Sequence, residues 1–200
     1  MPTLAEERRA LYREQLLIAA EREFARAGFA EAKMTEIAAA ANLSLATVYK
    51  TFPGKQEIWN ELHSKRMEAL LALVRTRVDA SESPLERLLT GIGAVADFLT
   101  SHDAYLDLSL AAGTDWLAPA GGQGVQRTVW GAGLDTIAEG VRAAADAGEL
   151  TQLRPSLAAA LVVSSLQVWL ADWVAAGRDR PDDEVVAELV AHLRRVLAAG

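Results

Sequence analysis

The sequence predicts an all-α protein of about nine helices. Apolar residues recur at helical spacing almost everywhere, and no stretch alternates between apolar and polar residues as a half-buried strand would. Apolar residues make up 51% of the 200 residues, which is enough to build a core and argues against intrinsic disorder. The sequence has no cysteine, so disulfide frameworks, thiol catalysis and cysteine-type zinc sites are excluded.

The first four helices are expected at residues 6–27, 34–41, 45–51 and 55–79. Gly28 is expected to end the first helix as a C-cap glycine. Residues 42–44 form a tight turn between the two short helices, and Pro53-Gly54 stops the second of them. Ser81–Pro84 ends the long fourth helix.

Five further helices are expected at residues 84–100, 103–112, 123–147, 155–177 and 182–198. Pro155 suits the first turn of its helix, where a missing N–H costs nothing. Asp182 or Asp179 is expected to N-cap the last helix.

Two features predict a cytoplasmic protein without a membrane segment. Long apolar stretches such as Leu157 to Val163 are interrupted by polar residues well short of a membrane span. Glu6 to Arg9 stand where a secretion signal would need an apolar run.

Charge is distributed unevenly along the chain. Residues 1–66 carry ten Lys/Arg against nine Asp/Glu, whereas residues 67–200 carry ten against eighteen, and all four lysines lie in the first part. An acidic body joined to such a module can still bind DNA, because the local field on the docking face decides binding. Ordinary enzymes show the same asymmetry, so charge alone does not distinguish a DNA-binding protein from an enzyme.

Residues 34–52 predict a helix-turn-helix. The apolar positions Ile37, Val48 and Phe52 would pack the two short helices against the first helix, and the second short helix would fit the DNA major groove. Ser44 is a suitable N-cap for this recognition helix. Two short helices and a turn also occur in other all-α proteins, so the spacing by itself does not decide the function.

The stretch from Ile37 to Lys55 closely resembles the DNA-binding signature of the TetR/AcrR family of transcriptional regulators, loosely I-A-x-x-A-G-V-S-x-x-T-L-Y-x-x-F-x-x-K. The matching residues here are Ile37, Ala38, Ala41, Ser44, Thr47, Tyr49, Phe52 and Lys55. The resemblance implies an N-terminal three-helix DNA-binding domain, residues 1–54, and a C-terminal helical effector-binding and dimerisation domain, residues 55–200.

The resemblance also implies roles for individual residues. Tyr49 and Lys55 are expected to contact phosphates, which position the protein without reading sequence. Ser44, Leu45, Thr47 and Lys50 are expected on or beside the base-reading face, with Ala46 on its rim.

This chain departs from the family pattern at three positions. Asn42 replaces the usual glycine and tolerates the left-handed turn conformation. Leu45 replaces an often polar residue. Lys33 stands where a threonine commonly caps the second helix, with Thr35 two residues later, so we expect a phosphate contact from Lys33 or Thr35 at that helix start.

The body of the family holds a ligand cavity, and the aromatic residues of this chain suggest its lining. The expected effector-binding residues are Phe98, Tyr105, Trp130, Leu134, Trp169, Asp172 and Trp173. Such a lining favours a small, largely apolar molecule. The alternative is that these side chains fill the core completely.

The sequence favours a homodimeric repressor that binds a palindromic operator and is released by its effector. The helices at 155–177 and 182–198 are expected to form the dimer, with an apolar stripe in the last helix at Val186, Leu189, Val190, Leu193 and Leu197. No cofactor and no metal are expected, since His63, His102 and His192 lack ligand-spaced partners. The rival interpretation is an all-α enzyme or small-molecule carrier in which the helix-turn-helix is only scaffold.

Overall fold

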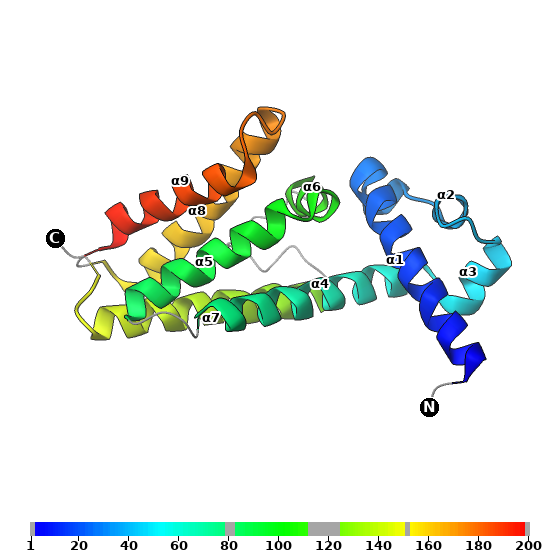
Figure 1. Ribbon diagram of the computed structural model, residues 1–200, viewed down its shortest axis with the longest axis horizontal. Helices are drawn as coiled ribbons and strands as arrows, with labels where there is room; N and C mark the ends of the chain where they lie inside the picture. Colours follow the sequence, from blue (N-terminus) through cyan, green and yellow to red (C-terminus); the bar gives the residue numbers. More distant parts are fainter. Residues whose placement is uncertain (1–2, 79–82, 112–124, 151–152, 199–200) are drawn as a thin grey trace. The chain divides into compact units, whose positions relative to one another are not determined.

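The computed structural model describes residues 3–78, 83–111, 125–150 and 153–198. These residues form nine α-helices and no β-strand (Figure 1). The helices are α1 (Leu4–Glu31), α2 (Met34–Ala40), α3 (Leu45–Thr51), α4 (Lys55–Val78), α5 (Pro84–Thr100), α6 (Asp103–Ala111), α7 (Val125–Asp146), α8 (Pro155–Ala175) and α9 (Asp182–Leu197). The all-α prediction is confirmed, and each helix lies close to its expected range.

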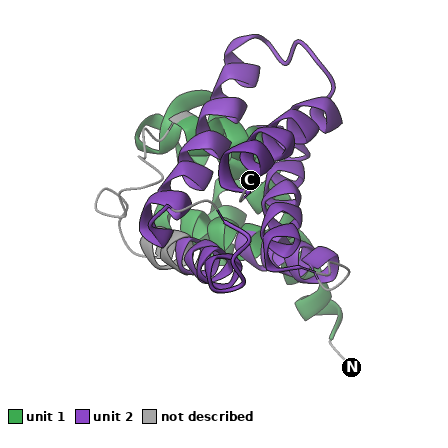
Figure 2. Cartoon of the chain, turned by 90° about the vertical axis from the view of Figure 1, so that its left-hand side faces the viewer, with its two compact units in different colours: residues 1–66, 104–113 green, residues 67–103, 114–200 purple. Residues whose placement is uncertain are grey.

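The chain divides into two compact units (Figure 2). Unit 1 contains Met1–Arg66 and Ala104–Gly113, and unit 2 contains Met67–Asp103 and Thr114–Gly200. Unit 1 therefore includes the first half of α4 and nearly all of α6 in addition to α1, α2 and α3. The functional boundary expected after Gly54 stays a prediction.

Helix α1 begins two residues earlier than expected because Thr3 and Glu6 form a capping box. The Thr3 backbone N–H donates to the Glu6 carboxylate at 2.7 Å, and the Glu6 N–H donates to Thr3 Oγ1 at 3.3 Å. At the other end Gly28 interrupts the helix with φ +78° and ψ 157°, backbone angles that favour glycine, but the C-cap residue of α1 is Ala32 and not the predicted Gly28. One short turn follows to Glu31.

The core of unit 1 forms where α1, α2, α3 and the first half of α4 present their apolar faces. Its fully buried side chains include Leu16, Phe24, Ile37, Phe52 and Ile58. Phe24, Phe29 and Trp59 form an aromatic cluster with ring centroids 4.6–5.5 Å apart. This cluster fixes α1 against α4 and so provides the support for α2 and α3.

In unit 2, α5 packs against α7, α8 and α9, and α8 packs against α7 and α9. Pro155 begins α8, as expected. The last helix is capped differently from the prediction, because Pro181 is its N-cap residue. Asp182 is the first helical residue instead, and its carboxylate accepts a 3.0 Å hydrogen bond from the Asp183 N–H.

Candidate nucleic-acid interface and apolar pocket

Helices α2 and α3 and the four residues between them form the predicted helix-turn-helix. Asn42 adopts φ +55°, so the left-handed turn expected at this position is confirmed. The Leu43 N–H donates to the Ala38 carbonyl at 2.9 Å and closes the turn. Val48 is fully buried, which fixes the inner face of α3 to the core of unit 1.

Ser44 caps α3 as predicted. Its Oγ accepts a 3.1 Å hydrogen bond from the Thr47 N–H, and Thr47 Oγ1 lies 2.8 Å from the same oxygen. Thr51 Oγ1 donates to the Thr47 carbonyl at 2.8 Å. These bonds define both ends of a helix only seven residues long.

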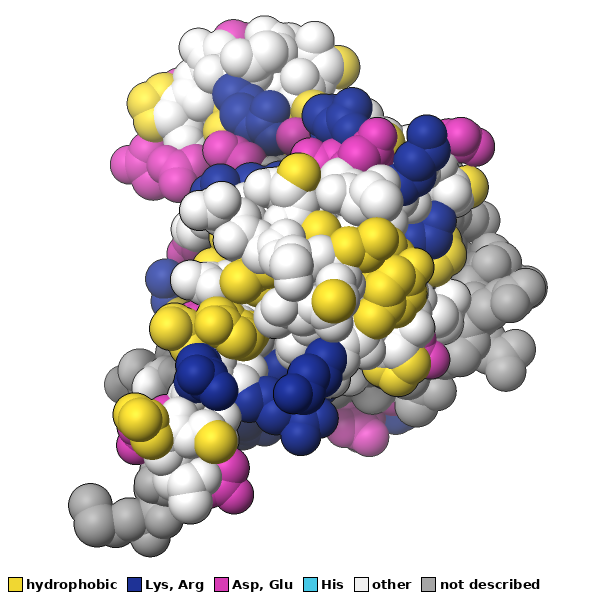
Figure 3. Space-filling view, turned by 90° about the vertical axis from the view of Figure 1, so that its right-hand side faces the viewer, with side chains coloured by type: hydrophobic (Ala, Val, Ile, Leu, Met, Phe, Trp, Pro, Cys, Tyr) yellow, Lys and Arg dark blue, Asp and Glu magenta, His cyan; other side chains and the backbone are white. Residues whose placement is uncertain are grey.

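The outer face of α3 is exposed where the prediction placed DNA contacts. Leu45, Ala46, Tyr49 and Lys50 are exposed, and Thr47 is half-buried beside Ser44. Basic and apolar side chains lie interspersed on the side of the molecule shown in Figure 3. A mixture of a phenol, a cation and aliphatic groups is suited to phosphate contacts and thymine methyl contacts.

Lys33 and Thr35 are both exposed at the start of α2. No side chain caps this helix, and Lys33 is its N-cap residue. The first amides of α2 are therefore not bonded by a capping side chain, and the Lys33 ammonium is close to them in sequence. A phosphate contact at this position stays a prediction.

Lys55 is engaged inside unit 1. Its Nζ donates to the carbonyls of Ala30 and Ala32 at 2.8 and 2.9 Å and lies 4.8 Å from the centroid of the Phe29 ring. The side chain therefore binds the end of α1, in an arrangement that sequence reasoning missed. To contact a phosphate, Lys55 would have to break its bonds to these carbonyls or donate its remaining N–H to the phosphate.

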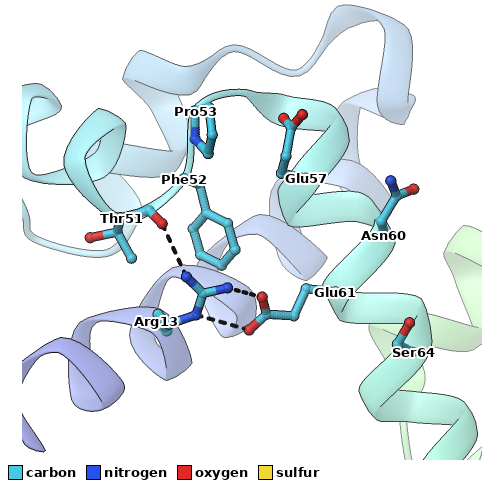
Figure 4. Close-up of a pocket in the computed structure, with 8 residues that line it drawn as sticks. All are labelled: Arg13, Thr51, Phe52, Pro53, Glu57, Asn60, Glu61 and Ser64. Atoms are coloured by element: carbon cyan, nitrogen blue, oxygen red, sulfur yellow. Dashed lines mark hydrogen bonds and ion pairs between the residues drawn. The ribbon is translucent and has the colours of Figure 1, made fainter. Parts of the chain in front are cut away.

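A hollow of about 450 Å³ lies beside α3 in unit 1 (Figure 4). Arg13 of α1 donates through Nη1 to the Thr51 carbonyl at 3.1 Å and through Nε to Glu61 Oε1 at 3.2 Å, and Nη2 also contacts the Glu61 carboxylate. The Arg13 guanidinium lies 4.4 Å from the centroid of the Phe52 ring. One side chain thus joins α1, α3 and α4.

Two further polar pairs lie in unit 1, the first buried and the second partly buried. His63 Nδ1 lies 3.0 Å from the Tyr105 hydroxyl, and Arg66 makes a bidentate ion pair with Glu21. Burial lowers the pKa of His63 to about 4 and raises the pKa of Tyr105 well above its usual value. His63 is therefore neutral near pH 7, and no ion pair joins it to a carboxylate among the residues that the structure describes.

Unit 2 contains an apolar pocket of about 480 Å³. Helices α4, α5, α7 and α8 line it with side chains that include Leu70, Val74, Leu88, Ile92, Leu134, Ile137 and Leu166. The polar side chains in its lining are few and exposed, namely Arg75, Arg87, Thr136 and Glu139. The apolar character of the lining agrees with the sequence-based expectation, but the residues that α4 contributes, among them Leu70 and Val74, were not among those expected.

Of the seven residues expected to bind an effector, Leu134 lies in this pocket. Phe98 stacks on His102, Tyr105 belongs to unit 1, and Trp169 packs on His192. Trp173 is buried and donates to the Arg180 carbonyl at 2.9 Å, while the Asp172 side chain is exposed near Arg180. The Trp130 side chain lies outside the described residues.

The stripe expected at the dimer interface is packed inside unit 2. Leu189, Leu193 and Leu197 are fully buried and Val186 nearly so. The prediction that this stripe covers a partner is therefore wrong for these four residues, because α5 and α8 already bury it. The face left open belongs to α8, where Leu157 and Val168 are 41% and 60% exposed.

Within the described part of the chain, α8 is also the one helix that is long and apolar enough to cross a membrane. This is weak evidence for a membrane segment, since core helices of other proteins pass the same test. A third of its most apolar window is buried in unit 2. Among the same residues, no group of three or more His, Asp or Glu side chains is arranged to hold a metal ion.

The capped, outward-facing α3 and the preceding α2 have the arrangement of a helix-turn-helix, which is typical of transcription regulators. Residues 16–62 match the family model for bacterial regulatory proteins of the tetR family. The resemblance drawn from Ile37 to Lys55 is therefore confirmed over this segment. No protein of curated function matches the chain.

Solved structures extend the likeness in fold to nearly the whole chain. The ketosteroid transcriptional regulator KstR2 of Mycobacterium tuberculosis is 20% identical with a TM-score of 0.79, covering 94% of this chain and 95% of its own. AibR, solved with isovaleryl coenzyme A and operator DNA, is 20% identical with a TM-score of 0.74 and coverages of 90% and 97%. FadR from Bacillus subtilis, solved with stearoyl-CoA, is 16% identical with a TM-score of 0.71 and coverages of 90% and 96%.

Proposed function

We propose that this protein is a ligand-responsive transcriptional repressor that acts in the cytoplasm. The observation that carries the proposal is the outward face of α3, where Tyr49 and Lys50 are exposed on a capped recognition helix inside a segment that matches the tetR family model. Phosphate contacts from these residues would supply affinity, and Leu45 and Thr47 would contribute base contacts.

The apolar pocket of unit 2 is the proposed effector site. AibR and FadR were solved with acyl-CoA ligands, which combine an apolar chain with an anionic group. The pocket here offers apolar walls together with Arg75 and Arg87. We infer an effector whose hydrocarbon part lies among Leu70, Val74 and Ile92 and whose acidic group meets the two arginines.

Helix α4 connects this pocket to the DNA-binding unit. Met67, Leu70 and Val74 line the pocket, and Lys55 to Arg66 of the same helix belong to unit 1. An effector that displaces the second half of α4 would alter how the two recognition helices of a dimer meet DNA. The effector must bind the conformation that releases DNA more tightly than the conformation that binds DNA. An effector with equal affinity for both would not shift the equilibrium between them.

A homodimer through the open face of α8 completes the proposal. Along α8, the half-buried or exposed residues recur at heptad-like spacing, at Leu157, Leu161, Ser164, Val168 and Ala171. Such a stripe is typical of a helix that packs against a second helix. A two-fold pairing would bury it and would present two copies of α3 to successive major grooves.

The experiment that tests the proposed function is selection of genomic DNA fragments by the purified full chain. We expect enrichment of a short palindromic sequence, and loss of that enrichment in the Tyr49→Ala/Lys50→Ala double variant. An enzyme or carrier that uses the helix-turn-helix only as scaffold would select no sequence. It would also be unaffected by the double variant, because both side chains lie at the surface.

A further inference from the structure

Helix α3 depends on neighbouring elements for its orientation. A helix of seven residues is not stable alone, and the last carbonyls of any helix lack partners within it. The Val48 carbonyl accepts from the Phe52 N–H at 2.8 Å. The Thr51 carbonyl, one of those at the end of α3, is bonded by Arg13 of α1 at 3.1 Å.

Arg13 is itself held in place. Its Nε and Nη2 contact the two carboxylate oxygens of Glu61, and its guanidinium lies against the Phe52 ring. A bidentate pair with a planar cation fixes direction as well as distance. A cation at the C-terminal end of α3 also has a favourable interaction with the helix dipole.

All the described polar contacts of Arg13 point inward, toward Thr51 and Glu61 (Figure 4). The exposed residues Tyr49 and Lys50 directly precede Thr51 in the last turn of α3. A change in the position of the Thr51 carbonyl would therefore move the two groups proposed to meet DNA, without any contact between Arg13 and DNA being required.

We propose that Arg13 is a positioning residue for DNA recognition, which holds the last turn of α3 at a fixed place between α1 and α4. This inference rests on the proposed DNA-binding function. It assigns to the Arg13–Glu61 pair a role in sequence selectivity that goes beyond the stability of unit 1.

Unit 1 contains a matched control. Arg66 makes the same kind of bidentate pair with Glu21, again between α4 and α1, with donor–acceptor distances of 2.8 and 2.5 Å. Neither partner has a described hydrogen bond to α3. Arg13→Lys and Arg66→Lys both keep the charge and lose the guanidinium fork. The two variants differ because only Arg13 has a described hydrogen bond to the recognition helix, at the Thr51 carbonyl.

The test measures affinity for the operator selected by the wild-type chain and for unrelated duplex DNA, over a range of salt concentrations. Circular dichroism first establishes a temperature at which all variants are folded. For Arg13→Lys we expect the ratio of operator affinity to non-specific affinity to fall about tenfold or more, the effect of one charge-assisted hydrogen bond. The salt slope should not change, and Arg66→Lys should keep the wild-type ratio.

Equal ratios for Arg13→Lys and Arg66→Lys would overturn the role of Arg13. A salt slope reduced by about one contact per subunit in Arg13→Lys would also overturn it, since Arg13 would then bind phosphate directly. If Arg13→Lys does not fold, Glu61→Gln replaces it, because that change frees the guanidinium while α4 keeps a polar side chain. A wild-type chain that selects no duplex contradicts the proposed function itself, which separates the two failures.

Discussion

The Tyr105 hydroxyl lies 3.0 Å from His63 Nδ1, and this bond joins α6 to α4 inside unit 1. Trp59 covers the His63 ring at a centroid distance of 4.5 Å, and the imidazole is almost completely buried. Burial lowers the pKa of His63 to about 4. Between this value and 6.5 the ring is therefore neutral in the folded chain but protonated in the unfolded chain.

This difference predicts a pH-dependent stability. Between pH 6.5 and about 4 the unfolded state binds one proton more at His63, so the free energy of unfolding falls as pH falls through this window. The contribution is about 3 kcal/mol in total, from roughly 1.4 kcal/mol per pKa unit. Urea unfolding at several pH values should show that His63→Gln has a shallower pH dependence than the wild type.

The Tyr105→Phe variant is the control for this prediction. It keeps the ring buried and removes only the hydroxyl, and burial is the cause of the His63 shift. Its stability should be lower at every pH, with the pH dependence of the wild type. A Tyr105→Phe profile as shallow as that of His63→Gln would contradict the assignment to burial.

A second prediction separates Lys50 from Lys55, two lysines that the family resemblance places among the DNA contacts. Lys55→Ala removes two bonds to the Ala30 and Ala32 carbonyls and should lower the free energy of unfolding by about 1–3 kcal/mol. Lys50→Ala should change stability by less than about 0.5 kcal/mol, because this side chain is exposed. It should instead reduce the salt slope of operator binding by about one contact per subunit.

Thermal unfolding and a salt titration of each variant measure both effects. The opposite result for Lys55→Ala, unchanged stability with a reduced salt slope, would show that Lys55 leaves α1 and binds phosphate in the complex.

A third prediction concerns assembly. Val168→Glu places a charge on the exposed stripe of α8 and should give a folded monomer with weakened operator binding. Leu189→Glu should unfold unit 2, because that side chain is fully buried within one chain. Sedimentation and circular dichroism distinguish a monomer from an unfolded chain. A Val168→Glu protein that remains a dimer would show that this face of α8 does not form the dimer interface.

A fourth prediction concerns the effector. Ile137→Trp should fill part of the pocket and weaken effector binding without changing operator affinity, since Ile137 lies on α7 in unit 2. Arg75→Ala/Arg87→Ala should weaken binding of a long-chain fatty acid and leave binding of the corresponding alcohol unchanged, because the alcohol has no charge for the arginines to meet. Calorimetric titration with both compounds tests this. Equal losses for acid and alcohol would contradict the proposed role of the two arginines.

The sequence predicted local structure well wherever a local cause dominates. Asn42, Ser44 and Pro155 have the conformations or capping roles expected of them, because each depends on its own backbone and its nearest neighbours. The position of the recognition helix followed from the same rules. Its exposed face could be predicted because Val48 and Phe52 define the buried side by helical spacing.

Contacts between distant residues could not be predicted in the same way. An apolar stripe such as Leu189 and Leu193 is compatible with a partner chain or with the protein's own α5 and α8, and periodicity does not distinguish them. The tryptophans were expected in a pocket, yet Trp173 is buried and bonded to the Arg180 carbonyl. Arg13 and Lys55 bind backbone carbonyls, and a carbonyl leaves no signal in the sequence.

The most direct test of the account is footprinting of the wild-type chain on the DNA fragment that it enriches. We expect two protected half-sites about one helical turn, roughly 34–36 Å, apart, and protection that disappears in Tyr49→Ala/Lys50→Ala. Protection that persists in this double variant, or binding without a preferred sequence, would contradict the claim that α3 of this chain reads DNA.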